Sequence, residues 1–298
     1  MPYYNRHSDY DAIKVAQILV QYQRTPAAIA LLADSVDELK PDPEMVCNML
    51  IQAPMEQETE KIDPESTRAL IKYLQDSGAI AMGVLGEIEF CYLIWLDEHS
   101  DVCPRAIEYR LANEPDSFCD LMSVLYKKRH DEATTRTIPQ AISKRLFQLT
   151  YQYSVIPGMD WDGNFHSDVF NSWMEAVKVW AKENDRYEVS MHTIGGALSY
   201  VEFDEDGIIN TAVMTELNKI DNDELRKGYR LGTFNQRGVH WVDPEGKPEK
   251  ELAQRYQYRA NAVEALGYIR FAELLRSIAD GYLAEAQDNI REFGEVED

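Results

Sequence analysis

Apolar residues recur at every third or fourth position through most of this 298-residue chain. This spacing places them on one face of an α-helix. Runs in which apolar and polar residues alternate, the pattern of a half-buried strand, are almost absent, and both glycine and proline are scarce. The pattern therefore predicts an all-α fold.

Prolines stand between the periodic segments of the N-terminal half or at their first turns, where a missing backbone N–H costs nothing. Asp9 or Asp11 can cap the first helix, and Ser77-Gly78 marks the end of the fourth. One segment, 85–95, is apolar on more than one face and predicts a central buried helix. Helices are predicted over residues 13–20, 26–32, 45–50, 66–77, 85–95, 104–111 and 115–125.

Fewer and longer periodic segments follow in the C-terminal half. Helices are predicted over residues 142–153, 169–180, 189–200, 248–266 and 271–286. Gly195 and Gly196 weaken the third of these by about 1 kcal/mol each, so we expect the pair to mark the close approach of another helix. Short joins between amphipathic helices favour stacked helical hairpins, packed either as an irregular α-solenoid or as two helical bundles.

Two polar stretches compete as the boundary between subdomains. The segment from His130 to Arg136 is the preferred one, which gives an N-terminal helical-hairpin subdomain over residues 1–130 and a C-terminal helical subdomain over residues 136–298. The loop from Pro157 to Asp168 is the alternative.

The chain is strongly acidic, with 52 acidic against 30 basic residues and a formal net charge of −22. Such a surface repels phosphate backbones and anionic lipid headgroups, so neither direct nucleic-acid binding nor membrane binding is expected. It suits a basic protein partner. Neither an apolar span nor a secretory signal is evident, and the predicted location is cytoplasmic.

Motifs that carry chemistry are missing from the sequence. Phosphate-binding glycine loops, zinc-protease histidine pairs, the serine-hydrolase elbow and paired cysteines do not occur, so no cofactor, metal or catalytic residue is assigned. Asp160–Asn164 and Glu202–Ile209 resemble the start of a calcium loop. Both lack the closing ligand, and they are better interpreted as Asp-Gly turns before helices.

The segment Arg230–Gly246 (RLGTFNQRGVHWVDPEG) is the densest unusual one, and the spacing predicts a loop between helices. Arginine and tryptophan are the usual anchors of interfaces, and arginine binds carboxylates well. A purely structural role, with Trp241 filling a groove and Arg237 pairing with a local carboxylate, is the alternative. The candidate binding residues are Arg230, Asn235, Arg237, His240, Trp241 and Asp243.

Several segments resemble the C-terminal helical region of large multidomain bacterial proteins that have no assigned activity. They are YLQDSGAI at 73–80, CYLIWL at 91–96, RLANEPDSF at 110–118 and GTFNQRGVHWVDPEGKPEKELAQRY at 232–256. The resemblance supplies no catalytic residues. It implies that this chain is a fragment that follows other domains, and by analogy that it is a sensor or regulatory part of a defence or signalling system.

The leading hypothesis is a non-catalytic helical interaction or scaffold module that binds another protein or other domains of its own polypeptide. The first alternative is an enzyme whose site lies at the 230–246 loop against the Asp160–His166 loop, with His240 or His166 as acid or base. A further alternative is an acidic mimic of nucleic acid, although no regular row of carboxylates is evident.

Overall fold

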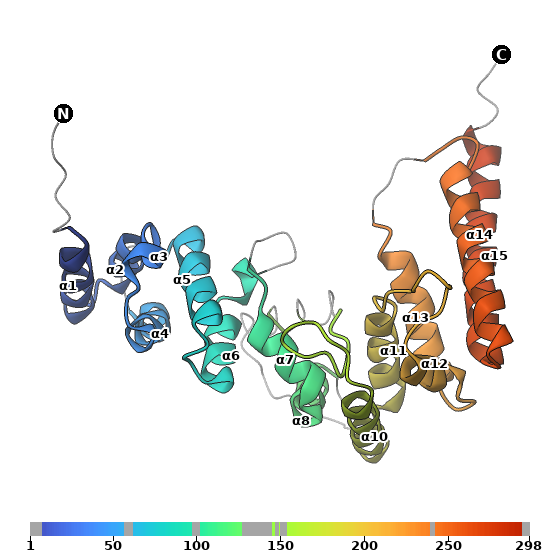
Figure 1. Cartoon of the computed structure of the whole chain (residues 1–298), viewed down its shortest axis with the longest axis horizontal. Helices are drawn as coiled ribbons and strands as arrows, with labels where there is room; N and C mark the ends of the chain where they lie inside the picture. Colours follow the sequence, from blue (N-terminus) through green and yellow to red (C-terminus); the bar gives the residue numbers. More distant parts are fainter. Residues whose placement is uncertain are drawn as a thin grey trace. The chain divides into compact units, whose positions relative to one another are not determined.

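The computed structural model describes residues 8–56, 62–96, 102–126, 145–146, 149, 154–238 and 242–293. Within these residues helices are the only regular secondary structure, which confirms the predicted all-α class, and the only β-type contact there is an isolated bridge between Met159 and Phe165. Figure 1 shows the succession of helices. None of the described helices has both the length and the apolarity needed to cross a bilayer.

The chain divides into two compact units, Met1–Arg110 and Leu111–Asp298. Helix α7 (Arg105–Asn113) contains the point of division. The polar segment at which the sequence predicts a boundary, 130–136, lies outside the described residues. The division into subdomains 1–130 and 136–298 therefore stays a prediction.

Helices α4 and α5 begin where the prolines and acidic caps indicate, whereas the predicted cap of the first helix is wrong, because Asp9 and Asp11 both lie inside α1. Asp42 and Asp63 accept hydrogen bonds from backbone N–H groups in the first turns of α4 and α5, and Gly78 ends α5 in the left-handed conformation with φ 61°. The elements are α1 (Ser8–Gln21), α2 (Thr25–Ala33), α3 (Val36–Leu39), α4 (Pro43–Gln52), η1 (Ala53–Met55), α5 (Pro64–Ser77), α6 (Met82–Cys91) and η2 (Leu93–Trp95).

The predicted single helix over 85–95 is wrong. Helix α6 ends at Cys91, and a short 3-10 turn, η2, follows it. The Tyr92 hydroxyl donates to the carbonyl of Leu50 in α4 over 2.8 Å, and the Tyr92 side chain is buried. This contact with a distant helix fixes the chain at the break, and no proline or glycine marks it in the sequence.

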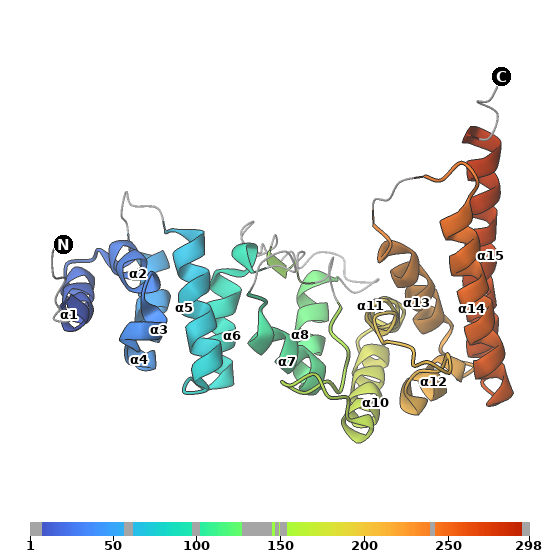
Figure 2. The ribbon, with the colours of Figure 1, turned by 45° about the horizontal axis from the view of Figure 1, so that its top comes forward.

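Each helix of the first unit packs on near neighbours along the chain. Helix α2 contacts α1 and α5, and α4 contacts α5 and α6. Figure 2 shows α5 and α6 side by side. The apolar side chains in the interior of this unit are almost fully buried. They include Ile29 and Leu32 of α2, Leu50 of α4, and Leu70 and Leu74 of α5. Packing between sequence neighbours is the arrangement that the helical-hairpin pattern predicts.

A buried carboxylate holds the first turn of α7. Glu89 of α6 is fully buried and accepts hydrogen bonds from Gln75 and from the backbone N–H groups of Ala106 and Ile107, over 2.8–3.1 Å. These N–H groups have no partner within the helix, and a negative charge at a helix N-terminus is favourable. Burial nevertheless raises the pKa of Glu89, because desolvation outweighs these bonds.

A second carboxyl beside Glu89 makes the first unit sensitive to pH. Burial, and then the nearby charge of Glu89, raise the pKa of Glu108 from 4.5 to about 7. Between these values the folded chain holds a proton that the unfolded chain has lost. The contribution of this group to stability is therefore fully present below pH 4.5 and is lost as the pH rises through 7.

Substituting Glu108→Gln is expected to leave the melting temperature nearly unchanged at about pH 5 and to raise it by roughly 2–4 °C at about pH 8, where wild type carries the buried charge. Thermal unfolding followed by circular dichroism at the two pH values measures this. Glu87→Gln, at an exposed position of α6, is the control. Equal shifts of both variants at both pH values would contradict the assignment.

The second unit contains the described helices that follow α7, among them the three longest. They are α8 (Pro115–Leu125), α10 (Ser167–Glu183), α11 (Tyr187–Leu198), α12 (Thr211–Asn218), α13 (Asp223–Asn235), α14 (Lys247–Ala265) and α15 (Ile269–Phe293). Almost all of the predicted helix over 142–153 lies outside the described residues. The predicted apolar face of α10 is buried at Trp173 and Val177, and the Trp173 ring contacts Phe118 of α8 with centroids 5.1 Å apart.

Helices α11 and α13 cross at glycines. A Cβ atom on Gly195 would lie 2.0 Å from the carbonyl oxygen of Leu225, and one on Gly228 would lie 2.0 Å from that of His192. A Cβ atom on Gly232 would lie 2.8 Å from the carbonyl oxygen of Gly196. The prediction that the Gly195-Gly196 pair marks the close approach of another helix is confirmed, and the approaching helix is α13.

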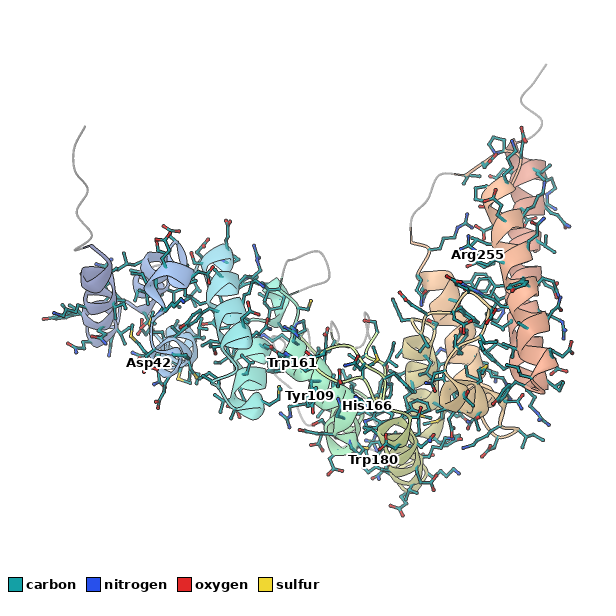
Figure 3. The ribbon with its side chains drawn as sticks, viewed as in Figure 1. Asp42, Tyr109, Trp161, His166, Trp180 and Arg255 are labelled. Atoms are coloured by element: carbon teal, nitrogen blue, oxygen red, sulfur yellow. The ribbon has the colours of Figure 1, made fainter. Side chains whose placement is uncertain are left out.

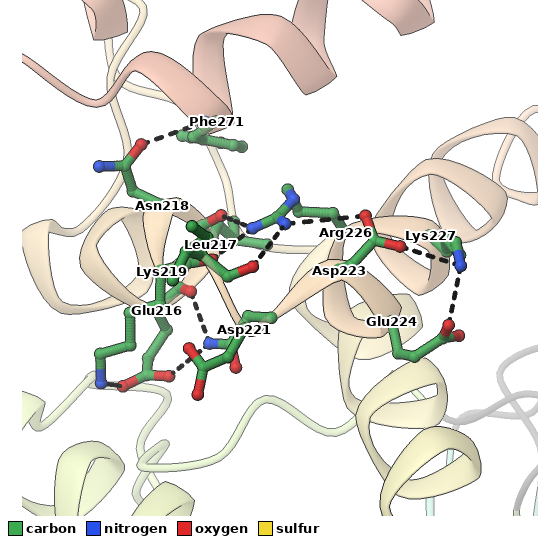
Figure 4. A network of polar contacts seen from close by, with 12 residues as sticks. Glu216, Leu217, Asn218, Lys219, Asp221, Asp223, Glu224, Arg226, Lys227 and Phe271 are labelled. Carbon is green, nitrogen blue, oxygen red and sulfur yellow. Dashed lines mark hydrogen bonds and ion pairs between the residues drawn. The ribbon is translucent and has the colours of Figure 1, made fainter.

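A buried polar network joins α10, α12 and α13. Lys178 of α10 forms an ion pair with Glu216 of α12, and Asn222, which is fully buried, donates to the same carboxylate over 2.9 Å. Asn218 accepts from the backbone N–H groups of Arg270 and Phe271 at the start of α15. Part of this network is drawn in Figure 4. Because its members come from several helices, the network fixes α12 against its neighbours.

Candidate functional site

The segment 230–246, predicted as a loop, is helical in its first third. Arg230 and Asn235 belong to α13, so the prediction of a loop is wrong for these residues. Gly228 and Gly232 lowered the apparent helical propensity of this region. Their role is to let α13 approach α11, and the packing gained there overrides propensity.

Arg237 lies just after α13, and its guanidinium group pairs with carboxylates of the same chain. It forms ion pairs with Glu249 of α14 and with Glu285 of α15, the second over 2.8 Å, and its guanidinium lies 5.8 Å from the centre of the Tyr282 ring. Glu249 is fully buried. These contacts tie the end of α13 to both helices of the α14–α15 hairpin.

The other predicted site residues do not converge in the described structure. The Arg230 guanidinium lies 5.1 Å from the centre of the Phe234 ring on its own helix, and the carbonyl of Asn235 accepts from Gly238. Asp243 accepts from the backbone N–H of Glu245 in a turn before α14. His240 and Trp241 lie outside the described residues.

The Asp160–His166 loop forms the predicted Asp-Gly turn. Asp160 accepts from the backbone N–H groups of Asp162 and Asn164 and pairs with the exposed His166 ring over 2.8 Å. The hydrogen bond from His166, and then those from Asn164, lower the pKa of Asp160. Just before this loop, the backbone N–H of Gly158 donates to the carbonyl of Ala112, and the carbonyl of Met159 accepts from the Asn113 side chain. Because His240 lies outside the described residues, the enzyme hypothesis stays untested.

Aromatic rings and guanidinium groups form a continuous ladder between α13 and the α14–α15 hairpin. Phe234 contacts Tyr282 with ring centroids 4.9 Å apart, and Tyr282 stacks on Tyr256 at 5.8 Å. Arg259 lies 5.0 Å from the centre of the Tyr256 ring and 3.9 Å from that of Phe203. The ladder attaches the hairpin to α13 and to the segment before α12.

The outer end of the ladder continues into an exposed face of α14. Arg255, Tyr258 and Arg259 stand at positions i, i+3 and i+4, which places them on one side of the helix. We call these residues the arginine face of α14. Figure 3 labels Arg255 on the side of α14 toward α13. Arg255 is exposed, Tyr258 is 57% exposed and Arg259 is partly buried.

The guanidinium groups of this face have no carboxylate within salt-bridge distance in the described part of the chain, whereas Arg237 has two and Arg276 has one. This is unexpected in a chain with 52 acidic residues. Desolvation lowers the pKa of Arg259, and the nearby charge of Arg255 also contributes. A partly buried cation without an anionic partner is costly, so this pair is a candidate for an external anion.

The arrangement is chemically suited to binding an anion. Among the residues that the structure describes, no group of His, Cys, Asp and Glu side chains is placed to hold a metal ion. Arginine planes stacked on aromatic rings present their N–H groups outward in a fixed fork. Comparisons with protein-family models, with curated proteins and with solved structures find no match, so the resemblance to multidomain bacterial proteins stays a hypothesis.

Proposed function

We propose that this chain is a helical interaction module and that the arginine face of α14 is where its partner docks. The observation that carries the proposal is the exposure of Tyr258 between two arginines that have no carboxylate partner among the described residues. Tyrosine and arginine dominate the binding energy of protein interfaces. They also lose little side-chain freedom on binding when neighbouring rings already hold them.

The stacking of the second unit supports the same function. Helix α14 packs mainly on α15 and leaves its other side to the ladder and to solvent. Stacked helices of this kind present extended surfaces, and their usual role is to bind other proteins. Other domains of the same polypeptide are partners of the same class.

Selection of displayed random peptides on the whole chain tests this proposal. We expect enriched peptides whose affinity for Tyr258→Ala falls by about 2 kcal/mol, a loss of roughly thirtyfold. The matched control is Lys250→Ala, which removes an exposed cation from the same helix and should bind as wild type does. Absence of any enriched family, or peptides that bind both variants equally, would reject the arginine face as the docking surface.

A further inference from the structure

The chemistry of the arginine face specifies what kind of partner group it receives. We propose that Arg255 and Arg259 together bind a single carboxylate carried by the partner, next to an aromatic residue that packs on Tyr258. This inference rests on the proposed function and adds the chemical class of the ligand to it.

Arg259 is the fixed member of the pair. Its guanidinium lies 3.9 Å from the centre of the Phe203 ring and 5.0 Å from that of Tyr256, so rings of two different elements limit its motion. An arginine held in this way presents a planar fork that matches the two oxygens of a carboxylate. A lysine at the same position would keep the charge but lose both the stacking and the fork.

Arg255 is the exposed member, one helical turn before Arg259 on the same face. Because it has no carboxylate within salt-bridge distance in the described residues, its N–H groups are open to solvent or to a ligand. Two guanidinium groups one turn apart repel each other, and the nearby charge of Arg255 contributes to the lowered pKa of Arg259. A bound anion between them would remove this repulsion.

The surroundings limit the charge of the ligand. The segment that carries Phe203 also carries four carboxylates, Glu202, Asp204, Glu205 and Asp206, and Gly207 of this segment lies against the Tyr258 ring. The chain as a whole has a net charge of −22. A polyanion such as nucleic acid would be repelled, whereas one carboxylate can be held by the two arginines. A protein segment with a lone Asp, Glu or C-terminal carboxylate therefore fits best.

The test uses the whole chain labelled with ¹⁵N in its arginine side chains and followed by NMR. The probes are Ac-Trp-Glu-NH2, its uncharged counterpart Ac-Trp-Gln-NH2, and inorganic phosphate. The Nε–Hε signals of Arg255 and Arg259 are assigned from Arg255→Lys and Arg259→Lys. We expect both signals to shift saturably with the glutamate peptide and not with the glutamine peptide. Each lysine variant should weaken binding by about tenfold.

Lys250→Ala is the matched control, because it removes one positive charge from α14 outside this face. It should bind the glutamate peptide as wild type does, and the circular-dichroism melts of Lys250→Ala and Arg255→Lys should agree with that of wild type. Equal responses to the two peptides, a response to phosphate alone, or shifts that Lys250→Ala reduces as much as Arg255→Lys does would each overturn the inference. The proposed function would survive these results if displayed peptides without a carboxylate still required Tyr258.

Discussion

Replacing Gly228 with alanine is expected to destabilise the second unit by about 3 kcal/mol, because the added methyl group cannot fit at the crossing of α11 and α13. Its Cβ would lie 2.0 Å from the carbonyl oxygen of His192 and 2.8 Å from the carbonyl carbon. Backbone atoms cannot rotate away as a flexible side chain can. The helices would have to separate, which would expose the apolar surface around the buried Tyr229.

The expected effect on stability is opposite to the usual effect of replacing a helical glycine with alanine. In an unconstrained helix, alanine is more favourable than glycine by about 1 kcal/mol. Gly196→Ala supplies the matched control, since its Cβ would meet nothing closer than the Gly228 carbonyl oxygen at 4.0 Å. Urea unfolding followed by circular dichroism should show a large loss for Gly228→Ala and none for Gly196→Ala. Similar midpoints for the two variants would show that the helices do not cross this closely.

Replacing Arg237 with alanine is expected to cost about 3–5 kcal/mol, because it leaves the fully buried Glu249 without its guanidinium partner. The hairpin of α14 and α15 should be affected first, since Arg237 also binds Glu285. Thermal unfolding of the variant measures the loss. Lys247→Ala removes an exposed ion pair with Glu245 at the start of the same hairpin, and it should change the stability by less than about 1 kcal/mol.

A double substitution separates the ion pair from other effects at this position. Arg237→Met combined with Glu249→Gln removes both charges, so it should recover a large part of the stability that Arg237→Ala loses. An unchanged melt of Arg237→Ala, together with lost peptide binding, would instead return Arg237 to the role of a ligand-binding residue that the sequence suggested.

Much of the fold follows from local signals in the sequence. The starts of α2, α4, α5 and α8 coincide with prolines, and Gly78 ends α5 as its position predicts. The predicted core positions of α15, including Phe271, Ile278 and Tyr282, are buried. These features depend on the helix itself or on a strong apolar stripe, so a single sequence contains them.

The features that the sequence does not predict depend on distant contacts. The break after Cys91 is fixed by the hydrogen bond between Tyr92 and Leu50, and the glycines of α13 are explained only by α11. Because these contacts are not visible in the sequence, the sequence predicts a loop from Arg230 onward, where the structure has the last part of α13. Leu266, the last residue of the helix predicted over 248–266, follows the end of α14 and is 55% exposed.

The candidate site also combines features that local sequence signals predict with features that depend on distant contacts. Arg237, a predicted binding residue, forms ion pairs with two carboxylates of the protein itself. Arg255 and Arg259 were not predicted, because an arginine at an exposed helical position is ordinary in a sequence. This pair is distinguished by the lack of a described carboxylate within salt-bridge distance and by the ring of Phe203 under Arg259. Their spacing of four residues was the one local signal available.

Site-directed photocrosslinking in cells that produce the protein tests most directly whether a partner docks on the arginine face of α14. A photoreactive phenylalanine analogue replaces Tyr258 in one variant and Lys250 in the other, so both probes lie on the same helix. We expect a discrete adduct from position 258 that disappears when Arg259→Gln is added, and no such adduct from position 250. Adducts of equal yield from both positions, or an adduct from position 258 that persists without Arg259, would contradict docking on this face.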